Sequence, residues 1–314
     1  MPKRQKVTPK QYVSKRLVSK RQQQKRRQRI ILLLGAVVII AVGSIIGYGY
    51  YDREVRPYHR DAIRVNDTVF DMGYYIKMLR LFGKGEDPSN WNEVTDRIIQ
   101  QIQDRELLRQ GAAEFDISIT RDEIDQELGE LPDVDSDLKK RVRIEAEYFL
   151  LLDKLREHFA AQTPTVAEQV HLEGILAETK DGAEEIASRL DGGEDFASLA
   201  QELSQDNNSK EQGGDLGWLP QGVMGPEFDE VAFSLEPGVL SQPIPDERGQ
   251  TEEGHWVIRV LEKDEARSID EDTHTIIAAN ELNRWFEEMK QDSLVEDELD
   301  EDKKLWAVKE MGGF

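Results

Sequence analysis

The sequence contains no cysteine among its 314 residues. Disulfide bonds, thiol catalysis and a membrane anchor on a lipid-modified cysteine are therefore all excluded. Metal-ligand spacing is missing as well, because the acidic run from Glu296 to Asp302 lacks the ordered pattern of a calcium loop. We interpret that run as a solvated surface, and the sequence implies neither a metal nor an organic cofactor.

Acidic residues are missing from the start of the chain. None precedes Asp52, whereas the first 29 residues contain twelve Lys and Arg, from Lys3 to Arg29. The whole chain has 41 basic and 63 acidic residues, so the part from Asp52 onward has 29 basic against 63 acidic residues, a net charge of about −34. The two signs of charge thus lie in different parts of the chain.

An uncharged segment of 22 residues, Ile30 to Tyr51, separates these parts. As a helix with a rise of about 1.5 Å per residue, it covers the roughly 30 Å hydrocarbon core of a bilayer. The basic flank predicts a cytoplasmic N-terminus and an extracytoplasmic bulk in a single-pass protein of the cell membrane. A cleaved signal peptide is the alternative, but the apolar region is long and no A-x-A-like cleavage site follows Gly49.

Two partner hypotheses arise from this N-terminal part. Gly43 and Gly47 have the G-x-x-x-G spacing that lets two membrane helices pack closely, which makes a homodimer a hypothesis. The basic tail could attract anionic lipid or nucleic acid, and we interpret it as a topology signal with some lipid attraction. No other segment indicates nucleic acid, so none is expected as a partner.

The next part, residues 52–164, has a helical pattern. A short extended pair is expected around the Asn66-Asp67 turn, and Asp71 is a candidate N-cap for the helix that follows. Apolar residues at helical spacing predict long helices over 91–115 and 135–159. Thr120 with Glu123 has a capping-box pattern, and Thr165 with Glu168 repeats it beyond Pro164, the predicted domain boundary.

Shorter, mixed elements follow between residues 165 and 263. A strand over 170–177, helices over 182–190 and 196–203, a glycine-rich turn over 213–218, a helix over 226–234 and strands over 239–244 and 255–261 are predicted. After residue 263 the helical pattern resumes, and we expect the segment 264–314 to pack back on the first helical domain. The predicted domains are therefore 1–29, 30–51, 52–164, 165–263 and 264–314.

A series of separated residues in the segment 165–263 has a recognisable order and spacing. These residues are Glu194-Asp195-Phe196-Ala197, Leu199-Ala200, Gly213-Gly214-Asp215-Leu216-Gly217-Trp218, Met224, Pro226-Glu227-Phe228, Ala232-Phe233, Leu235 and Pro237-Gly238. In them the segment resembles the parvulin family of prolyl isomerases. In the flanks, Val65-Asn66, Leu107-Leu108 and Trp285 stand where the membrane-associated foldases of the SurA and PrsA type, which the flanks resemble, would place them. These resemblances imply an α+β fold with one transmembrane helix, a helical chaperone-like domain and a β-α-α-β-α-β-β domain.

The resemblance also implies a set of site residues. Leu216, Met224 and Phe228 would form the proline pocket, and Asp206 and Thr251 would take the acidic and hydroxyl positions of the catalytic site. The structural alternative is that the three apolar residues belong to an ordinary core. About five extra residues between Pro243 and Gly254 make the placement of Thr251 an expectation only.

The chain departs from the family at two histidine positions, which hold Gly174 and Trp256. His255 lies one residue early, and His171 lies an odd number of residues from Gly174, so strand alternation places both on the opposite face. We expect the small Gly174 to make room for Trp256, which would fill the pocket and contact substrate.

The resemblance thus predicts a membrane-anchored, extracytoplasmic foldase that isomerises prolyl bonds in unfolded or proline-containing exported polypeptides. The missing histidine pair leaves an alternative open, a chaperone or binding module that uses the parvulin frame without turnover.

Overall fold

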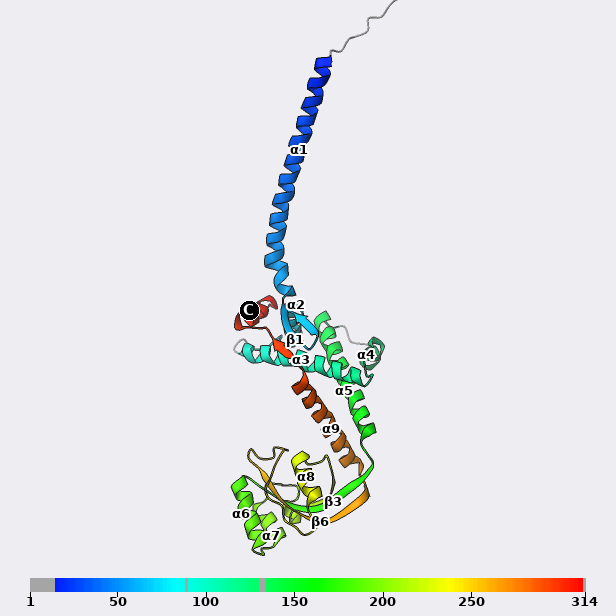
Figure 1. The fold of residues 1–314 in the computed structure, drawn as a ribbon, viewed down its shortest axis with the longest axis vertical. Coiled ribbons are helices and arrows are strands. Elements are labelled where there is room, and N and C mark those ends of the chain that lie inside the picture. Colours follow the sequence, from blue (N-terminus) through cyan, green and yellow to red (C-terminus); the bar gives the residue numbers. More distant parts are fainter. Residues whose placement is uncertain (1–14, 88–89, 130–133, 313–314) are drawn as a thin grey trace, which may run out of the picture.

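A computed structural model describes residues 15–87, 90–129 and 134–312 of the protein. A long N-terminal helix leads into a mainly helical unit, and a second unit built around a sheet lies farthest from that helix (Figure 1). The mixture of helices and sheets agrees with the predicted α+β class. The first 14 residues, which include part of the basic tail, lie outside the described residues.

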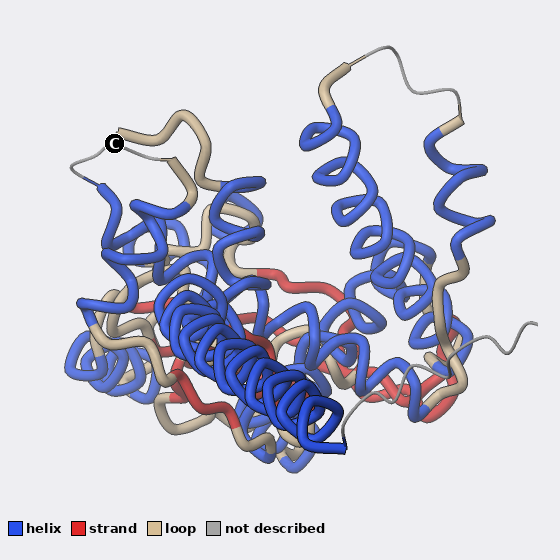
Figure 2. The backbone as a smooth tube through the Cα atoms, turned by 90° about the horizontal axis from the view of Figure 1, so that it is seen from above, coloured by secondary structure: helices blue, strands red, loops and turns tan. Residues whose placement is uncertain are grey.

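Helix α1 (Lys15–Tyr50) contains most of the predicted membrane segment. It continues without a break into a π-helical stretch, Tyr51–Val55, and a 3₁₀ stretch, Arg56–His59. Within the described residues, this is the one helix that is long and apolar enough to cross a membrane, and its apolar 18-residue window has a mean hydropathy of 2.9. Helix α1 projects away from the rest of the molecule in Figure 1, and in the view from above it lies in front of the other elements (Figure 2).

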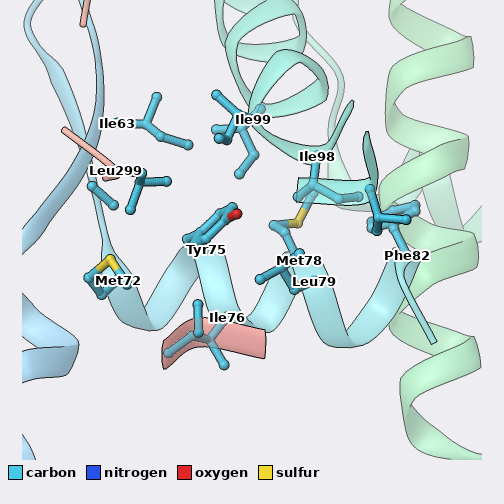
Figure 3. Packing of buried hydrophobic residues seen from close by; sticks show 14 of the residues in the cluster. Ile63, Met72, Tyr75, Ile76, Met78, Leu79, Phe82, Ile98, Ile99 and Leu299 are labelled. Carbon is cyan, nitrogen blue, oxygen red and sulfur yellow. The ribbon is translucent and has the colours of Figure 1, made fainter. Parts of the chain in front are cut away.

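The first part of the helical unit consists of α2 (Met72–Phe82), α3 (Trp91–Glu114), α4 (Arg121–Leu128) and α5 (Ser136–Gln162). Asp71 caps α2 by accepting a hydrogen bond of 2.8 Å from Tyr74 N, and Thr120 with Glu123 forms the capping box of α4. Both predicted caps are therefore confirmed. Side chains of α2 form the centre of the core, where Tyr75 and Met78 lie among residues of α3 (Figure 3).

The end of the chain joins this helical unit. Strand β7 (Val295–Asp297) pairs with β1 (Asp61–Val65) in a sheet of order β2-β1-β7, where β2 is Thr68–Asp71. Helix α10 (Glu301–Glu310) contributes Ala307 and Val308 to the same core. Residues 61–162 and 295–310, which lie on either side of the second unit in the sequence, therefore fold as one unit.

The second unit follows the predicted β-α-α-β-α-β-β order. Its elements are β3 (Val166–Ala177), α6 (Lys180–Asp191), α7 (Phe196–Leu203), β4 (Asp215–Pro220), α8 (Pro226–Ser234), β5 (Ile244–Pro245) and β6 (His255–Ser268). The antiparallel sheet has the order β4-β3-β6-β5. Alternating residues of β3 and β6 pack against α6 and α7 on one face and α8 on the other, because successive strand side chains point to opposite faces.

Two helices connect the units. Helix α5 leads into β3, β6 leads into α9 (Glu271–Asp292), and α5 and α9 lie side by side (Figure 1). Leu108 of α3, Leu155 of α5 and Leu282 of α9 share one buried cluster. Gly111 permits a close approach, since a Cβ there would lie 2.5 Å from Trp285 Cζ2.

Three local predictions were wrong. Thr165 and Glu168 do not begin a helix, because β3 starts at Val166 and Thr165 O accepts Ile269 N at 2.9 Å. The predicted turn over 213–218 becomes strand β4 from Asp215 onward, where it pairs with β3. The predicted strand over 239–244 shrinks to Ile244–Pro245 and an isolated bridge at Leu240, since Pro243 and Pro245 lack the N–H donors of a continuous ladder.

Candidate functional site

The four predicted substrate-binding residues come together from different elements. Leu216 is on β4, Met224 precedes α8, Phe228 is on α8 and Trp256 is on β6. They belong to or pack against one apolar cluster between the sheet and α8. The exposed fractions are only 5% for Met224, 2% for Phe228 and 1% for Trp256. The residues therefore form a closed apolar cradle in this structure.

Trp256 occupies the space that Gly174 leaves free. A Cβ on Gly174 would lie 2.7 Å from Leu216 Cδ1 and 3.1 Å from Trp256 Cε3. The ring of Trp256 also meets Phe228 edge to face, with 6.0 Å between the ring centroids. This packing fits the expectation that the missing side chain at position 174 makes room for the indole.

Both histidines of the sheet point away from the cradle, as strand alternation predicts. His255 Nδ1 lies 2.8 Å from the carbonyl oxygen of Glu253 in its own loop. His171 Nε2 lies 2.9 Å from Asp215 Oδ1, and its ring stacks on Trp218 with 5.4 Å between centroids. Burial alone would raise the pKa of Asp215, but hydrogen bonds from Gly217 N and His171 lower it overall.

Asp206 is buried in the loop between α7 and β4. Its Oδ2 accepts hydrogen bonds from Ser209 N at 3.1 Å and from Ser209 Oγ at 2.6 Å. Two neighbouring hydrogen bonds attach the loop to the backbone of Leu176. Gln205 N donates to Leu176 O at 2.8 Å, and Leu176 N donates to Ser204 Oγ at 3.3 Å. Asp206 thus orders a loop that is attached to β3 two residues after Gly174.

Thr251 lies in the loop between β5 and β6. Its Oγ1 is buried and has no hydrogen-bond partner within the described residues. A Cβ on Gly254 would collide with this hydroxyl and would lie 3.2 Å from Leu176 Cδ1. Gly254 is therefore needed for the close approach of Thr251 to the end of β3, beside the cradle.

A cleft of about 650 Å³ adjoins the cradle at Met224. One wall is the loop Gly222–Pro226 with Arg248, and the other is α9. Asn280 Nδ2 donates to Gly222 O at 2.8 Å, which holds the loop against α9. Burial raises the pKa of Asp229, which lines the cleft, to about 6, although its Oδ2 accepts Gly222 N at 2.6 Å. The contribution of α9 is not predictable from the sequence, because no local pattern marks a contact between segments so far apart.

A second, smaller cleft of about 140 Å³ lies in the helical unit and is likewise not predictable from the sequence. Phe70, Tyr74, Tyr148 and Arg105 are among its lining residues. The guanidinium of Arg105 lies 4.8 Å from the centroid of Tyr148. The buried Glu106 accepts Arg109 Nη2 at 2.6 Å. Burial would raise the pKa of Glu106, but its hydrogen bonds lower it overall. Aromatic faces and paired charges therefore line this cleft.

Within residues 15–87, 90–129 and 134–312, no group of three or more acidic or histidine side chains is arranged to hold a metal ion.

Comparisons with known proteins agree with this arrangement. Residues 164–262 match the family model of the rotamase, or PPIC-type PPIASE, domain. The foldase protein PrsA of Geobacillus kaustophilus is 30% identical over 227 residues, which are 66% of this chain and 79% of the relative. The foldase protein PrsA of Caldanaerobacter subterraneus is 33% identical over 180 residues, which are 53% of this chain and 56% of the relative.

Among solved structures, one match is the peptidylprolyl isomerase PrsA of Bacillus anthracis. It covers 77% of this chain and 95% of its own, with 21% sequence identity and a TM-score of 0.35. The sequence relatives and the matched domain establish the relationship. The chain belongs to the PrsA foldase family, and residues 164–262 are its PPIC-type PPIase domain.

Proposed function

We propose that this foldase catalyses cis–trans isomerisation of X-Pro bonds in exported polypeptides, on the extracytoplasmic side of a membrane to which α1 anchors it. The observation that carries the proposal is the convergence of Leu216, Met224, Phe228 and Trp256 in one apolar cradle of the PPIC-type domain. Such a cradle is suited to the ring of proline.

The chemistry requires no nucleophile or cofactor. Amide resonance sets a barrier of about 18–20 kcal/mol for rotation about the peptide bond. A site lowers this barrier by holding the twisted amide away from water and by matching its changed charge distribution. Each 1.36 kcal/mol of preferential stabilisation gives about a tenfold rate increase.

The polar residues have distinct places in this proposal. Thr251 has a buried hydroxyl without a partner in the described residues, so it can donate a hydrogen bond to a client amide and is proposed as a catalytic residue. Asp206 stands at the acidic position of the family motif and is proposed as the second catalytic residue. Its carboxylate orders the loop fastened to Leu176, beside the cradle.

A client proline must gain access to side chains that are almost fully buried. Met224 lines both the cradle and the cleft of about 650 Å³, so the cleft is the proposed route of entry. The polypeptide on either side of the proline would then lie between the loop Gly222–Pro226 and α9. Binding there would displace Met224 and expose the cradle.

A second candidate function is client holding without turnover. The cleft of the helical unit, with its aromatic and arginine side chains, supports it. The replacement of both usual histidines by Gly174 and Trp256 favours it as well. Holding and isomerisation are compatible in one protein, since the two clefts lie in different units.

The anchor and domain proposals follow from the sequence and the position of α1. Residues 1–29 would lie in the cytoplasm, 30–51 in the membrane and 52–314 outside, with functional divisions near residues 164 and 263. A Cβ added at Gly43 or Gly47 would meet no atom within 4 Å in this structure, so a second membrane helix could pack against both glycines. A homodimer through the membrane helix is therefore proposed. The charge of the outer part would favour basic clients, and added salt should weaken such a preference.

One pair of assays separates the two functions. The full chain in detergent or nanodiscs is tested for accelerated isomerisation of X-Pro peptides and for suppressed aggregation of an unfolded protein. We expect both activities. Suppressed aggregation without accelerated isomerisation would contradict the enzymatic function and support holding alone.

A further inference from the structure

The carboxylate of Asp246 connects several parts of the proposed proline site. Its Oδ1 accepts Trp256 Nε1 at 3.1 Å and Arg248 N at 3.3 Å. Its Oδ2 accepts Gln250 N at 2.8 Å, and its own N–H donates to Gly254 O at 2.8 Å. One residue therefore fastens both the indole and the loop that precedes β6.

The bond to Trp256 fixes the orientation of a ring that is 1% exposed. The indole N–H is a donor only, and a buried donor without an acceptor is costly. Turning the ring over would direct this N–H into the apolar cluster that contains Phe228 and Leu172. A hydrogen bond to an ionised acceptor is also stronger than a neutral one. The indole could pack against Gly174 with either edge turned toward the loop. Asp246 therefore favours the orientation in which Nε1–H points toward its carboxylate.

The loop ordered by Asp246 reaches two other sides of the cradle. Arg248 Nη1 lies 3.0 Å from Met224 Sδ, at the junction of cradle and cleft. Glu247 Oε2 accepts Glu227 N at 3.3 Å in the first turn of α8, the helix that carries Phe228. A carboxylate is favourable at such a helix N-terminus. The loop therefore contacts two of the four cradle residues, Trp256 and Met224, and also the helix that carries a third, Phe228.

We propose that Asp246 is a positioning residue of the prolyl site. It holds Trp256 in one orientation and keeps the loop closed against Met224 and α8, so that a client proline meets a preformed wall. This inference rests on the proposed function of the cradle. Asp246 acts through Trp256 and the loop, without contact with the client. Preorganisation of this kind lowers the cost of ordering the site when the client binds.

The test compares three variants of the full chain in nanodiscs. Asp246→Leu removes the acceptor, Asp246→Asn keeps one acceptor oxygen, and Glu252→Leu changes an exposed carboxylate of the same loop. The measurements are the Kd of a short X-Pro peptide, the KM and kcat of its isomerisation, and the ¹⁵N–H resonance of the Trp256 indole. Trp256→Phe assigns that resonance.

We expect Asp246→Leu to raise Kd and KM about tenfold, with a smaller change in kcat, and to shift the indole resonance and speed its hydrogen exchange. Asp246→Asn should restore the indole signal and most of the affinity, and Glu252→Leu should match wild type. Unchanged peptide affinity in Asp246→Leu, or an equal loss in Glu252→Leu, would overturn the inference.

A double variant keeps the test decisive if Asp246→Leu fails to fold. Asp246→Ala, which also removes the acceptor, should weaken peptide binding less in the Trp256→Phe background than in wild type, because the bond to the indole is already absent there; equal losses would overturn the inference. If wild type binds the peptide without turnover, the isomerase proposal fails while the positioning role is still judged on affinity. If wild type neither binds nor isomerises, both are wrong.

Discussion

Replacing Gly174 with alanine tests the packing on which the site depends. The added Cβ would lie 2.7 Å from Leu216 Cδ1 and 3.1 Å from Trp256 Cε3. Leu216 can move, but Trp256 is 1% exposed and fixed by Phe228 and Asp246. Overpacking of a filled core costs about 1–3 kcal/mol. Alanine in a strand otherwise gains roughly 0.5–1 kcal/mol over glycine. Because the rigid Trp256 keeps the overpacking cost in the upper part of its range, we expect a net loss of up to about 2.5 kcal/mol.

Hydrogen exchange of the amides in β3 and β6 measures this loss where it occurs. The matched control is Gly182→Ala on α6, whose Cβ would lie at an ordinary 3.4 Å from Thr179 Oγ1. That variant should be neutral or slightly more stable, because alanine favours helix. Trp256→Phe should relieve part of the cost of Gly174→Ala, since residues in contact are coupled by about 0.5–3 kcal/mol. Unchanged exchange in Gly174→Ala, or strictly additive effects, would refute the packing argument.

Two further predictions concern the cleft and the junction of the units. Asp229→Asn removes a carboxylate whose pKa burial raises to about 6. Between about pH 4 and 6 the native protein binds more protons there than the unfolded chain, so the free energy of unfolding falls as pH rises through this window. The variant should lack this decline in urea unfolding, and an identical pH slope in both proteins would count against it. Gly111→Ala would place a Cβ 2.5 Å from Trp285 Cζ2, so overpacking should destabilise the α3–α9 contact by about 1–3 kcal/mol. An unchanged urea midpoint would show that the contact adjusts freely.

The sequence predicts the helices well because their signals are local. Asp71 and the Thr120–Glu123 pair cap helices through residues three positions away, and α7 and α8 have the predicted bounds of 196–203 and 226–234. The same local pattern fails at Thr165, where pairing with the distant β6 overrides a capping-box sequence. Strand edges are equally hard to predict, since the prolines near Ile244 leave only a short ladder.

The residues of the site also fall into two groups, those that the sequence predicts and those that it does not. The motif predicts the residues of the apolar cradle, and strand alternation predicts that His255 and Trp256 face opposite sides. The contact of Asp246 with Trp256 depends on the path of a loop, and the bond from Asn280 to Gly222 joins residues 58 positions apart. Neither contact has a periodic or compositional signal. Such contacts are visible only once the fold brings the segments together.

The central claim is that an apolar cradle without the usual histidine pair isomerises prolyl bonds. Exchange NMR on an X-Pro peptide, with a small molar fraction of the full chain in nanodiscs, measures this directly. We predict faster cis–trans exchange with wild type, and a rate within about twofold of wild type when both His171 and His255 are replaced by alanine, because the effect on the barrier should be below about 0.4 kcal/mol. No acceleration by wild type, or a rate lost with those histidines, would contradict the account.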